Sequence, residues 1–198
     1  MSDNSQSEIK VRPKNYSGTL IYLMGPSGAG KDSLIERAKE AKLKDLVVAT
    51  RLVTRETNIK TDDLYLSEEA FQNLLSKGRL ALHWASHGFL YGIDKSIDTF
   101  LNQGQTVIIN GSRNYLPTAR QLYPHLKPIL ITAHIDILKA RLLNRDREDQ
   151  TAIMERLLRT NESFDLPMDE IKIIDNSGPL DKSSVQFINL LKELINQK

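Results

Sequence analysis

The sequence predicts an α/β fold with a parallel central sheet covered by helices on both faces, and three observations support this prediction. Short apolar runs alternate with segments of helical pattern along most of the chain, which is the order that produces such sheets. A glycine-rich segment directly follows the first apolar run and leads into a helical segment. The length of 198 residues allows one well-buried domain with a small inserted lobe.

The apolar runs are interpreted as buried strands because each is short and bounded by polar or turn-forming residues. Strands are expected at residues 20–24, 46–50, 80–84, 89–91, 106–110, 128–133 and 171–174. Helices are expected at residues 31–42, 67–75, 96–103, 117–122, 136–144, 152–163 and 184–196. Ser67 is the predicted N-cap of the second helix, and Gly104 ends the third. Residues 51–63 are polar and are expected to be irregular.

Composition excludes several classes of protein. The net charge is +2 and is not concentrated in a basic block, which argues against a nucleic-acid partner. The absence of cysteine excludes disulfides, thiolate metal sites and a cysteine nucleophile. No apolar run approaches the roughly 20 residues that span a bilayer, so no membrane association is expected. The cytoplasm is the expected location, and residues 1–18 are expected to form a flexible polar leader.

Residues 25–31 match the phosphate-binding pattern G-x-x-x-x-G-K between a predicted strand and a predicted helix. Glycines let the backbone curl so that its N–H groups point inward and form an anion nest. The helix N-terminus adds further unpaired N–H groups, and Lys31 can reach the β- and γ-phosphates. The pattern predicts a three-layer αβα fold of the P-loop NTPase type that binds ATP. The expected ATP-binding residues are Gly25, Pro26, Ser27, Gly28, Ala29, Gly30, Lys31, Asp32 and Ser33.

The segment departs from the usual pattern at two positions. Asp32 stands where Ser or Thr normally meets Mg²⁺, with Ser33 one residue later. The strand at 106–110 ends in Asn110, where many P-loop proteins place a metal-side aspartate. The two departures suggest that Asp32 supplies the carboxylate for Mg²⁺ that the other strand lacks. The alternative is that Asp32 only places a negative charge at the helix N-terminus.

Arginines follow two of the predicted strands, where ligands lie in open α/β sheets. Arg51 and Arg55 can pair with phosphate oxygens of an acceptor. Ser112 and Arg113 follow the strand at 106–110 and offer further donors. Tyr91, close to His87 and Gly88, completes the expected acceptor-binding set. A solvated charged loop is the alternative at each place.

A run of charged residues at about 145–151 is interpreted as a mobile lid. Arg145 and Arg147 are expected to close over the transferring phosphoryl group and, with Lys31, to be the catalytic residues. Arg141 shares a helix face with Arg145 through its i, i+4 spacing. A solvated surface is again the alternative. The kinase domain is expected to span residues 19–198, with the acceptor lobe at about 51–94.

These segments follow the order seen in guanylate kinases, and the sequence resembles still more closely the ribose 1,5-bisphosphate phosphokinases of phosphonate degradation. The most specific parts are Gly-Lys-Asp-Ser at 30–33 and Asn-Gly-Ser-Arg at 110–113. The similarity covers nearly everything after Gly18. Its other diagnostic parts are Arg-Leu-Val-Thr-Arg at 51–55, Ala-Leu-His-Trp at 81–84 and Gly-Phe-Leu-Tyr-Gly at 88–92.

The resemblance implies the ATP-dependent phosphorylation of ribose 1,5-bisphosphate to 5-phospho-α-D-ribose 1-diphosphate, with Mg²⁺ as cofactor. Guanylate kinases carry a second arginine shortly after the Thr-Arg pair, whereas this chain has Glu56-Thr57-Asn58 there. An oxygen of the 1-phosphate would be the nucleophile. It is anionic near neutral pH because its second pKa is about 6, so no strong general base is needed. Catalysis would then depend on positioning and charge stabilisation.

Three alternatives remain. A guanylate kinase would use the same reaction type with GMP as acceptor. A non-catalytic guanylate-kinase-like binding module usually lacks the P-loop lysine, which is present here as Lys31. A gluconate- or shikimate-type kinase would need a base for its hydroxyl acceptor. A homodimer is compatible with the sequence, which does not determine the oligomeric state.

Overall fold

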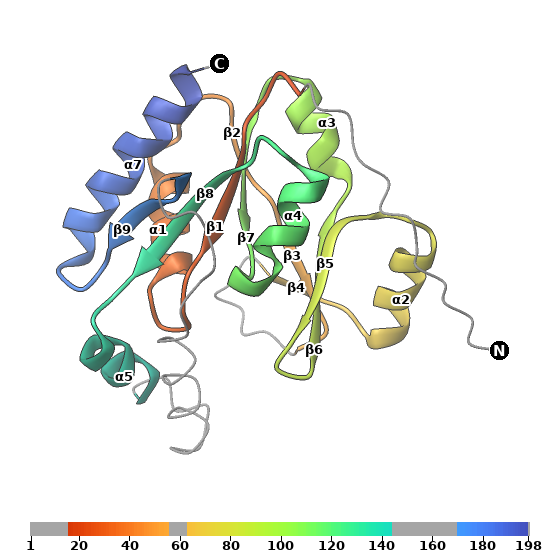
Figure 1. Ribbon diagram of the computed structural model, residues 1–198, viewed down its shortest axis with the longest axis horizontal. Coiled ribbons are helices and arrows are strands. Elements are labelled where there is room, and N and C mark those ends of the chain that lie inside the picture. Colours follow the sequence, from red (N-terminus) through yellow and green to blue (C-terminus); the bar gives the residue numbers. More distant parts are fainter. Residues whose placement is uncertain (1–15, 56–62, 144–169, 198) are drawn as a thin grey trace.

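The computed structural model describes residues 16–55, 63–143 and 170–197, and its centre is a five-stranded sheet (Figure 1). All strand pairs in this sheet are parallel. Their order is β2 (Leu46–Val48), β7 (Thr106–Asn110), β1 (Leu20–Met24), β8 (Lys127–Thr132) and β9 (Lys172–Asp175). Because β1 is the middle strand, the loop that follows it lies between the ends of β7 and β8.

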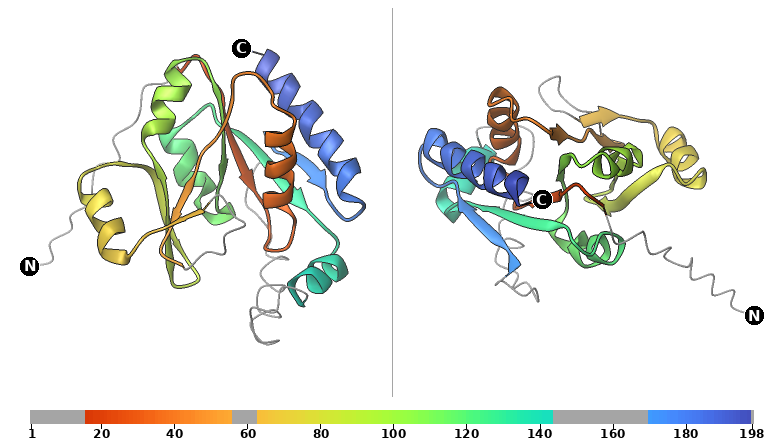
Figure 2. Two further views of the ribbon diagram at one scale, coloured as in Figure 1. Left: turned by 180° about the vertical axis from the view of Figure 1, so that it is seen from behind. Right: turned by 90° about the horizontal axis from the view of Figure 1, so that it is seen from above.

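The two faces of the central sheet carry separate hydrophobic cores, and β1 contributes to both because its side chains alternate. Leu20 and Tyr22 pack toward α3 (Ser96–Asn102) and α4 (Leu116–Leu122). Ile21 and Leu23 pack toward the opposite layer, which Figure 2 shows from behind and from above. Its helices are α1 (Lys31–Glu40), α5 (Ile135–Leu143) and α7 (Leu180–Asn196). The expected three-layer arrangement is confirmed.

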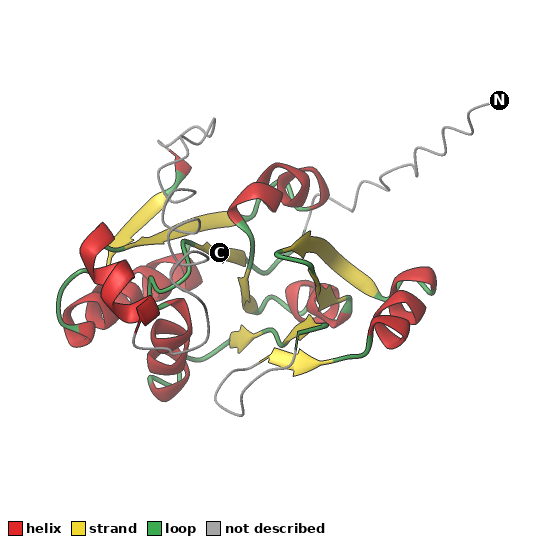
Figure 3. Ribbon diagram, turned by 90° about the horizontal axis from the view of Figure 1, so that it is seen from below, coloured by secondary structure: helices red, strands yellow, loops and turns green. Residues whose placement is uncertain are grey.

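A second, four-stranded sheet is built from residues 51–94 and lies to one side of the central sheet (Figure 3). Its order is β4 (Asp63–Tyr65), β3 (Arg51–Val53), β6 (Phe89–Asp94) and β5 (Leu80–Ser86). The turn between β5 and β6 has positive φ at His87 (52°) and Gly88 (77°), as a tight two-residue hairpin requires. Helix α2 (Glu68–Ser76) covers this sheet through Phe71, which packs on Leu52 and Leu80.

Several predicted boundaries differ from the structure. The strand expected at 46–50 ends at Val48, and a new strand begins at Arg51 in the other sheet. Residues 51–53 are therefore not irregular, because they pair with β6 and β4. Helix α7 begins at Leu180, four residues earlier than expected, because Pro179 serves as its N-cap. The helix expected at 152–163 and the lid with Arg145 and Arg147 lie outside the described residues.

The described start of the chain is attached to α3. The backbone N–H of Gly18 donates to the carbonyl of Leu101 at 2.8 Å, and the hydroxyl of Tyr16 donates to Asp98. Tyr16 and Gly18, the contacting residues, belong to the segment 1–18 that was expected to form the leader. Within the described residues no helix has the length and apolar character that crossing a membrane requires.

Candidate active site

The loop between β1 and α1 can close only with glycine at its key positions. Gly25, Gly28 and Gly30 all have positive φ, at 151°, 84° and 89°. A Cβ on Gly25 would lie 2.2 Å from the carbonyl oxygen of Ile131, and one on Gly30 would lie 2.3 Å from the side-chain nitrogen of Asn176. A side chain at either position would therefore force the loop away from its neighbours.

The amide groups of this loop are available to bind an anion. The N–H of Ala29 bonds within the loop to the carbonyl of Pro26 at 3.2 Å. The N–H groups of Gly28, Gly30 and Asp32 donate to no acceptor among the described residues. Those of Gly30 and Asp32 lie at the N-terminus of α1, where the helix adds partial positive charge. The arrangement has the donors of a phosphate cradle.

The ammonium group of Lys31 lies against the start of the same loop. Its Nζ donates to the carbonyl of Gly25 at 2.8 Å and to that of Pro26 at 3.0 Å. The positive charge is thus held next to the amide donors, and the flexible stem allows it to move toward a bound phosphate.

Two residues support the loop from outside: Arg141, which the sequence analysis grouped with Arg145, and Asn176, which it did not identify. Arg141 of α5 donates to the carbonyl of Gly28 at 3.3 Å and to that of Asn176 at 2.9 Å. The side-chain amide of Asn176 donates to the carbonyl of Ala29 at 2.8 Å. Asn176 is separated from the loop by 147 residues, and it matches no local motif, so no sequence signal identified it.

The two departures from the usual P-loop pattern are in contact. The side-chain amide of Asn110, at the end of β7, donates to Oδ1 of Asp32 at 3.0 Å. Asn110 is buried, and its own Oδ1 has no hydrogen-bond partner among the described residues. The pair therefore places one carboxylate and one unpaired buried oxygen beside the phosphate cradle, and this donor set suits a hydrated Mg²⁺ ion.

Arg51 has a partner that the sequence did not predict. Its Nε and Nη2 donate to the two carboxylate oxygens of Asp63, at 2.9 and 2.8 Å, across the β3–β4 pair. Its guanidinium group lies 5.3 Å from the centre of the Tyr91 ring, a cation–π distance. Burial lowers the pKa of Arg51, but the hydrogen bond and charge of Asp63, followed by the charge of Asp32, outweigh it and raise the pKa above its usual value. Arg51 is therefore a fixed cation, and its Nη1 makes no hydrogen bond to another described residue.

Two further residues of the predicted acceptor-binding set belong to the same small sheet: Arg55 comes two residues after β3, and Tyr91 lies on β6. The N–H of Thr54 donates to the carbonyl of Leu90 at 3.0 Å, and the hydroxyl oxygen of Thr54 accepts from the N–H of Leu90 at 2.9 Å. Arg55 follows directly and makes no hydrogen bond or ion pair with another described residue. Tyr91 stacks on Trp84 with ring centres 5.7 Å apart, and Trp84 in turn contacts Tyr115.

Tyr22 of the central strand contacts the segment at residues 110–113, which follows β7. The buried hydroxyl of Tyr22 donates to the carbonyl of Ser112 at 2.8 Å, and burial raises the pKa of Tyr22. A Cβ on Gly111 would lie 2.2 Å from the Tyr22 ring. The close approach that Gly111 permits is thus made by the ring of Tyr22. Ser112 and Arg113 then lead into the short 3₁₀ helix Arg113–Tyr115.

Comparison with known proteins gives relatives over nearly the whole chain. No family model matches the sequence. The ribose 1,5-bisphosphate phosphokinase PhnN of Azotobacter vinelandii is 41% identical over 178 residues, covering 89% of this chain and 97% of that protein. The enzyme of the same name from Psychromonas ingrahamii is 38% identical over 188 residues, covering 94% and 95%. The one from Desulfomicrobium baculatum is 42% identical over 177 residues, covering 88% and 94%.

Solved structures match the fold at low sequence identity. A guanylate kinase from Anaplasma phagocytophilum superposes with a TM-score of 0.68 at 17% identity, covering 90% of this chain and 87% of that one. A gluconokinase from Sinorhizobium meliloti gives 0.51 at 18% identity, covering 92% and 96%. These two matches concern the fold alone. The identity to the three PhnN proteins goes further, and on that basis the chain belongs to the ribose 1,5-bisphosphate phosphokinase family.

Proposed function

We propose that this protein transfers the γ-phosphoryl group of ATP to the 1-phosphate of ribose 1,5-bisphosphate, which yields ADP and 5-phospho-α-D-ribose 1-diphosphate. The substrates follow from the family. The observation that carries the chemistry is the fixed cation Arg51, which Asp63 holds through two hydrogen bonds beside the Tyr91 ring. The small sheet thus supplies a cation for the acceptor, and the central sheet supplies an amide cradle for the donor.

On the donor side, the free N–H groups of the loop would bind the β- and γ-phosphates, and Lys31 would leave the carbonyls of Gly25 and Pro26 for the phosphate oxygens. A 1-phosphate oxygen of the acceptor would form the new bond to the γ-phosphorus. The bond from that phosphorus to the bridging oxygen would break, and ADP would leave with its electron pair. No proton has to be removed from the nucleophile, which agrees with the lack of an assigned base.

On the acceptor side, the main obstacle is repulsion between two polyanions. Three arginines would neutralise the acceptor phosphates: Arg51 through Nη1, Arg55, whose guanidinium has no partner among the described residues, and Arg113. Ser112 would donate a hydrogen bond, and Tyr91 would present its hydroxyl and support Arg51 through its ring. Removing a well-placed cation from such a reaction can cost about 10³-fold in rate.

Mg²⁺ is the proposed cofactor, held by Asp32 together with the nucleotide phosphates, with Ser33 as a second candidate ligand. The metal would neutralise phosphate charge when bound. Asn110 donates to one oxygen of Asp32 and so leaves the other oxygen for the ion, while its own unpaired Oδ1 could accept from a metal-bound water.

The proposal also includes a lid, an acceptor lobe, a location and an oligomeric state. The lid residues lie outside the described part of the chain. Arg145 and Arg147 are proposed to close over the reacting phosphates as a lid at about residues 145–151. The acceptor lobe is proposed to span about residues 51–94. A cytoplasmic location and a homodimer are likewise proposals.

The test is an ADP-release assay with a panel of acceptors. We expect turnover with ribose 1,5-bisphosphate and little with GMP, ribose 5-phosphate or gluconate. The Lys31→Ala variant should lower kcat/KM for ATP at least about 100-fold, since it removes a charge that acts on the transferring group. Lys39→Ala serves as control, because Lys39 is exposed on α1 and pairs with Glu36 at 3.0 Å. Strong turnover with GMP alone would overturn the proposed acceptor.

A further inference from the structure

We infer that Asn176 and Ser183 are positioning residues for the nucleotide phosphates, because they set the direction in which an amide of the P-loop points. The inference rests on the proposed function, since it concerns how the same loop binds triphosphate. It assigns a role to the turn between β9 and α7, which lies outside the sequence motif.

Asn176 joins four parts of the fold through four hydrogen bonds. Its backbone N–H donates to the carbonyl of Thr132 at the end of β8, at 2.8 Å. Its carbonyl accepts from Arg141 of α5, and its side-chain amide donates to the carbonyl of Ala29. Its Oδ1 accepts from the hydroxyl of Ser183 at 2.6 Å. Asn176 is only 2% exposed, so these bonds do not compete with water and hold the side chain in one orientation.

The bond to Ala29 controls the next amide of the loop. A peptide unit is planar and trans, so the carbonyl of Ala29 and the N–H of Gly30 point in opposite directions. Holding that carbonyl toward Asn176 aims the Gly30 N–H away from it, and this N–H donates to no acceptor among the described residues. Gly30 has no side chain between the loop and Asn176, where a Cβ would lie 2.3 Å from the amide nitrogen. Asn176 thus prepares a donor before phosphate arrives.

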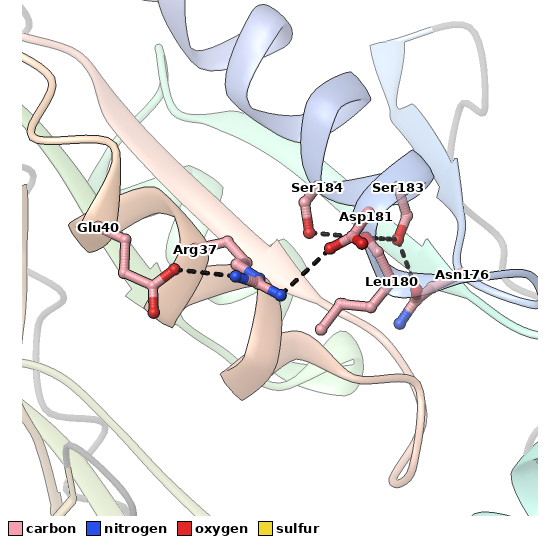
Figure 4. A network of polar contacts seen from close by, with 7 residues as sticks. All are labelled: Arg37, Glu40, Asn176, Leu180, Asp181, Ser183 and Ser184. Atoms are coloured by element: carbon pink, nitrogen blue, oxygen red, sulfur yellow. Dashed lines mark hydrogen bonds and ion pairs between the residues drawn. The ribbon is translucent and has the colours of Figure 1, made fainter.

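Ser183 determines which end of the Asn176 amide faces the loop. Its hydroxyl donates to Oδ1, which leaves the NH₂ group for Ala29 (Figure 4). Without that donor the amide could rotate and present its oxygen to the Ala29 carbonyl, which would repel it. Ser183 is 2% exposed, and its side chain also lies 3.0 Å from the carbonyl of Leu180.

The neighbouring residue provides a matched control. Ser184 is also buried, at 5% exposure, and its hydroxyl donates to the same carbonyl of Leu180 at 2.6 Å. Within the described part of the chain, the hydroxyl of Ser184 makes no hydrogen bond to Asn176 (Figure 4). Replacing either serine with alanine removes one buried hydroxyl from the first turn of α7, but only Ser183→Ala removes support from the loop.

The experiment measures the binding of inorganic tripolyphosphate to the full-length protein by calorimetry. This probe contacts the phosphate cradle without an adenosine group. Ser183→Ala should weaken binding about three- to tenfold, the effect of one lost hydrogen bond, and Ser184→Ala should change it less than about twofold. The melting temperatures of the two variants should be similar. In the kinase assay Ser183→Ala should raise KM for ATP while KM for the acceptor stays unchanged.

Asn176→Asp tests the other end of the same link. It keeps the shape of the side chain and the acceptor for Ser183 but presents oxygen to Ala29, so tripolyphosphate binding should weaken more than in Ser183→Ala. Equal affinities in Ser183→Ala and Ser184→Ala would overturn the inference alone. Failure of the wild-type protein to bind tripolyphosphate would instead overturn the proposed function, and the inference with it.

Discussion

At the scale of single residues, the site depends on charges whose orientation is set by buried partners. Asp63 holds Arg51 by two hydrogen bonds, and the side chains of the pair are 16% and 7% exposed. The side-chain amide of Asn110 holds Asp32 by one hydrogen bond. Arg51 and Asp32 therefore each have a neighbour that fixes their direction, and replacing the neighbour tests the role of the charge.

Asp63→Asn should raise KM for ribose 1,5-bisphosphate about tenfold and leave KM for ATP nearly unchanged. The neutral side chain keeps its volume but no longer holds Arg51 through two charge-assisted bonds, so the unused Nη1 loses its orientation. Steady-state kinetics with each substrate varied provides the measurement. Asp94→Asn is the control, because Asp94 lies 4.0 Å from the exposed Arg79. An unchanged acceptor KM in Asp63→Asn would show that Arg51 acts only in folding.

Asp32→Asn should shift the Mg²⁺ concentration for half-maximal activity upward by about tenfold or more, because a carboxylate ligand is lost. A charge that acts only on the helix N-terminus would instead change stability, by about 0.3–1 kcal/mol, and leave the metal requirement unaltered. Mg²⁺ titration of the kinase assay and of ADP binding distinguishes these outcomes. Glu36→Gln on the exposed side of α1 is the control.

At the scale of elements, the segment that follows β7 is positioned by a strand of the core. Gly111 passes the ring of Tyr22, and the Tyr22 hydroxyl binds the carbonyl of Ser112. Ser112 and Arg113 thus owe their place to packing against β1, and a change in this packing should affect both stability and acceptor binding.

Gly111→Ala should destabilise the protein by about 1–3 kcal/mol, the usual effect of forcing an extra methyl group into a packed core. It should also raise the acceptor KM, because the displaced segment carries Ser112 and Arg113. Denaturant unfolding and steady-state kinetics measure the two effects. Gly178→Ala is the matched control, since a Cβ there would meet nothing within 4 Å. Equal stability of the two variants would contradict the packing described for Tyr22.

At the scale of the whole molecule, the site lies where the two sheets meet. The central sheet supplies the donor loop at its middle strand, and the small sheet supplies Arg51 and Tyr91. Tyr22 lies in one of the two hydrophobic cores and connects it to the site from within β1, so its ionisation should affect the stability of the fold.

The free energy of unfolding should fall as pH rises above about 10, which is the pKa of an exposed tyrosine. The ionisation of Tyr22 on unfolding should contribute to this fall. The sign follows from the raised pKa in the folded protein: the folded state keeps the proton that the unfolded state loses, so stability is full below that pH and decreases above it. Thermal melts between pH 8 and about 11 should show a smaller decrease for Tyr22→Phe than for the wild type. Parallel curves would mean that Tyr22 does not titrate on unfolding.

Local patterns in the sequence were sufficient for the parts of the fold that local rules govern. The apolar runs predicted every strand of the central sheet, and G-x-x-x-x-G-K predicted the turn between β1 and α1. Residues 51–53 were misjudged because Arg51 begins a strand whose partners, Asp63 and Ile93, lie elsewhere in the chain. Polar composition alone does not reveal such pairing.

By itself the sequence determined the phosphate cradle, the three-layer fold and the family, because these depend on short motifs and on hydrophobic periodicity. Only the tertiary structure decided which residues orient the site. Asp63 binds Arg51 across a strand pair. Tyr22 binds Ser112, which is 90 residues away in the sequence. Asn176 binds Ala29, which is 147 residues away in the sequence. Such contacts depend on how the sheets are ordered and packed, and no local pattern of residues encodes them.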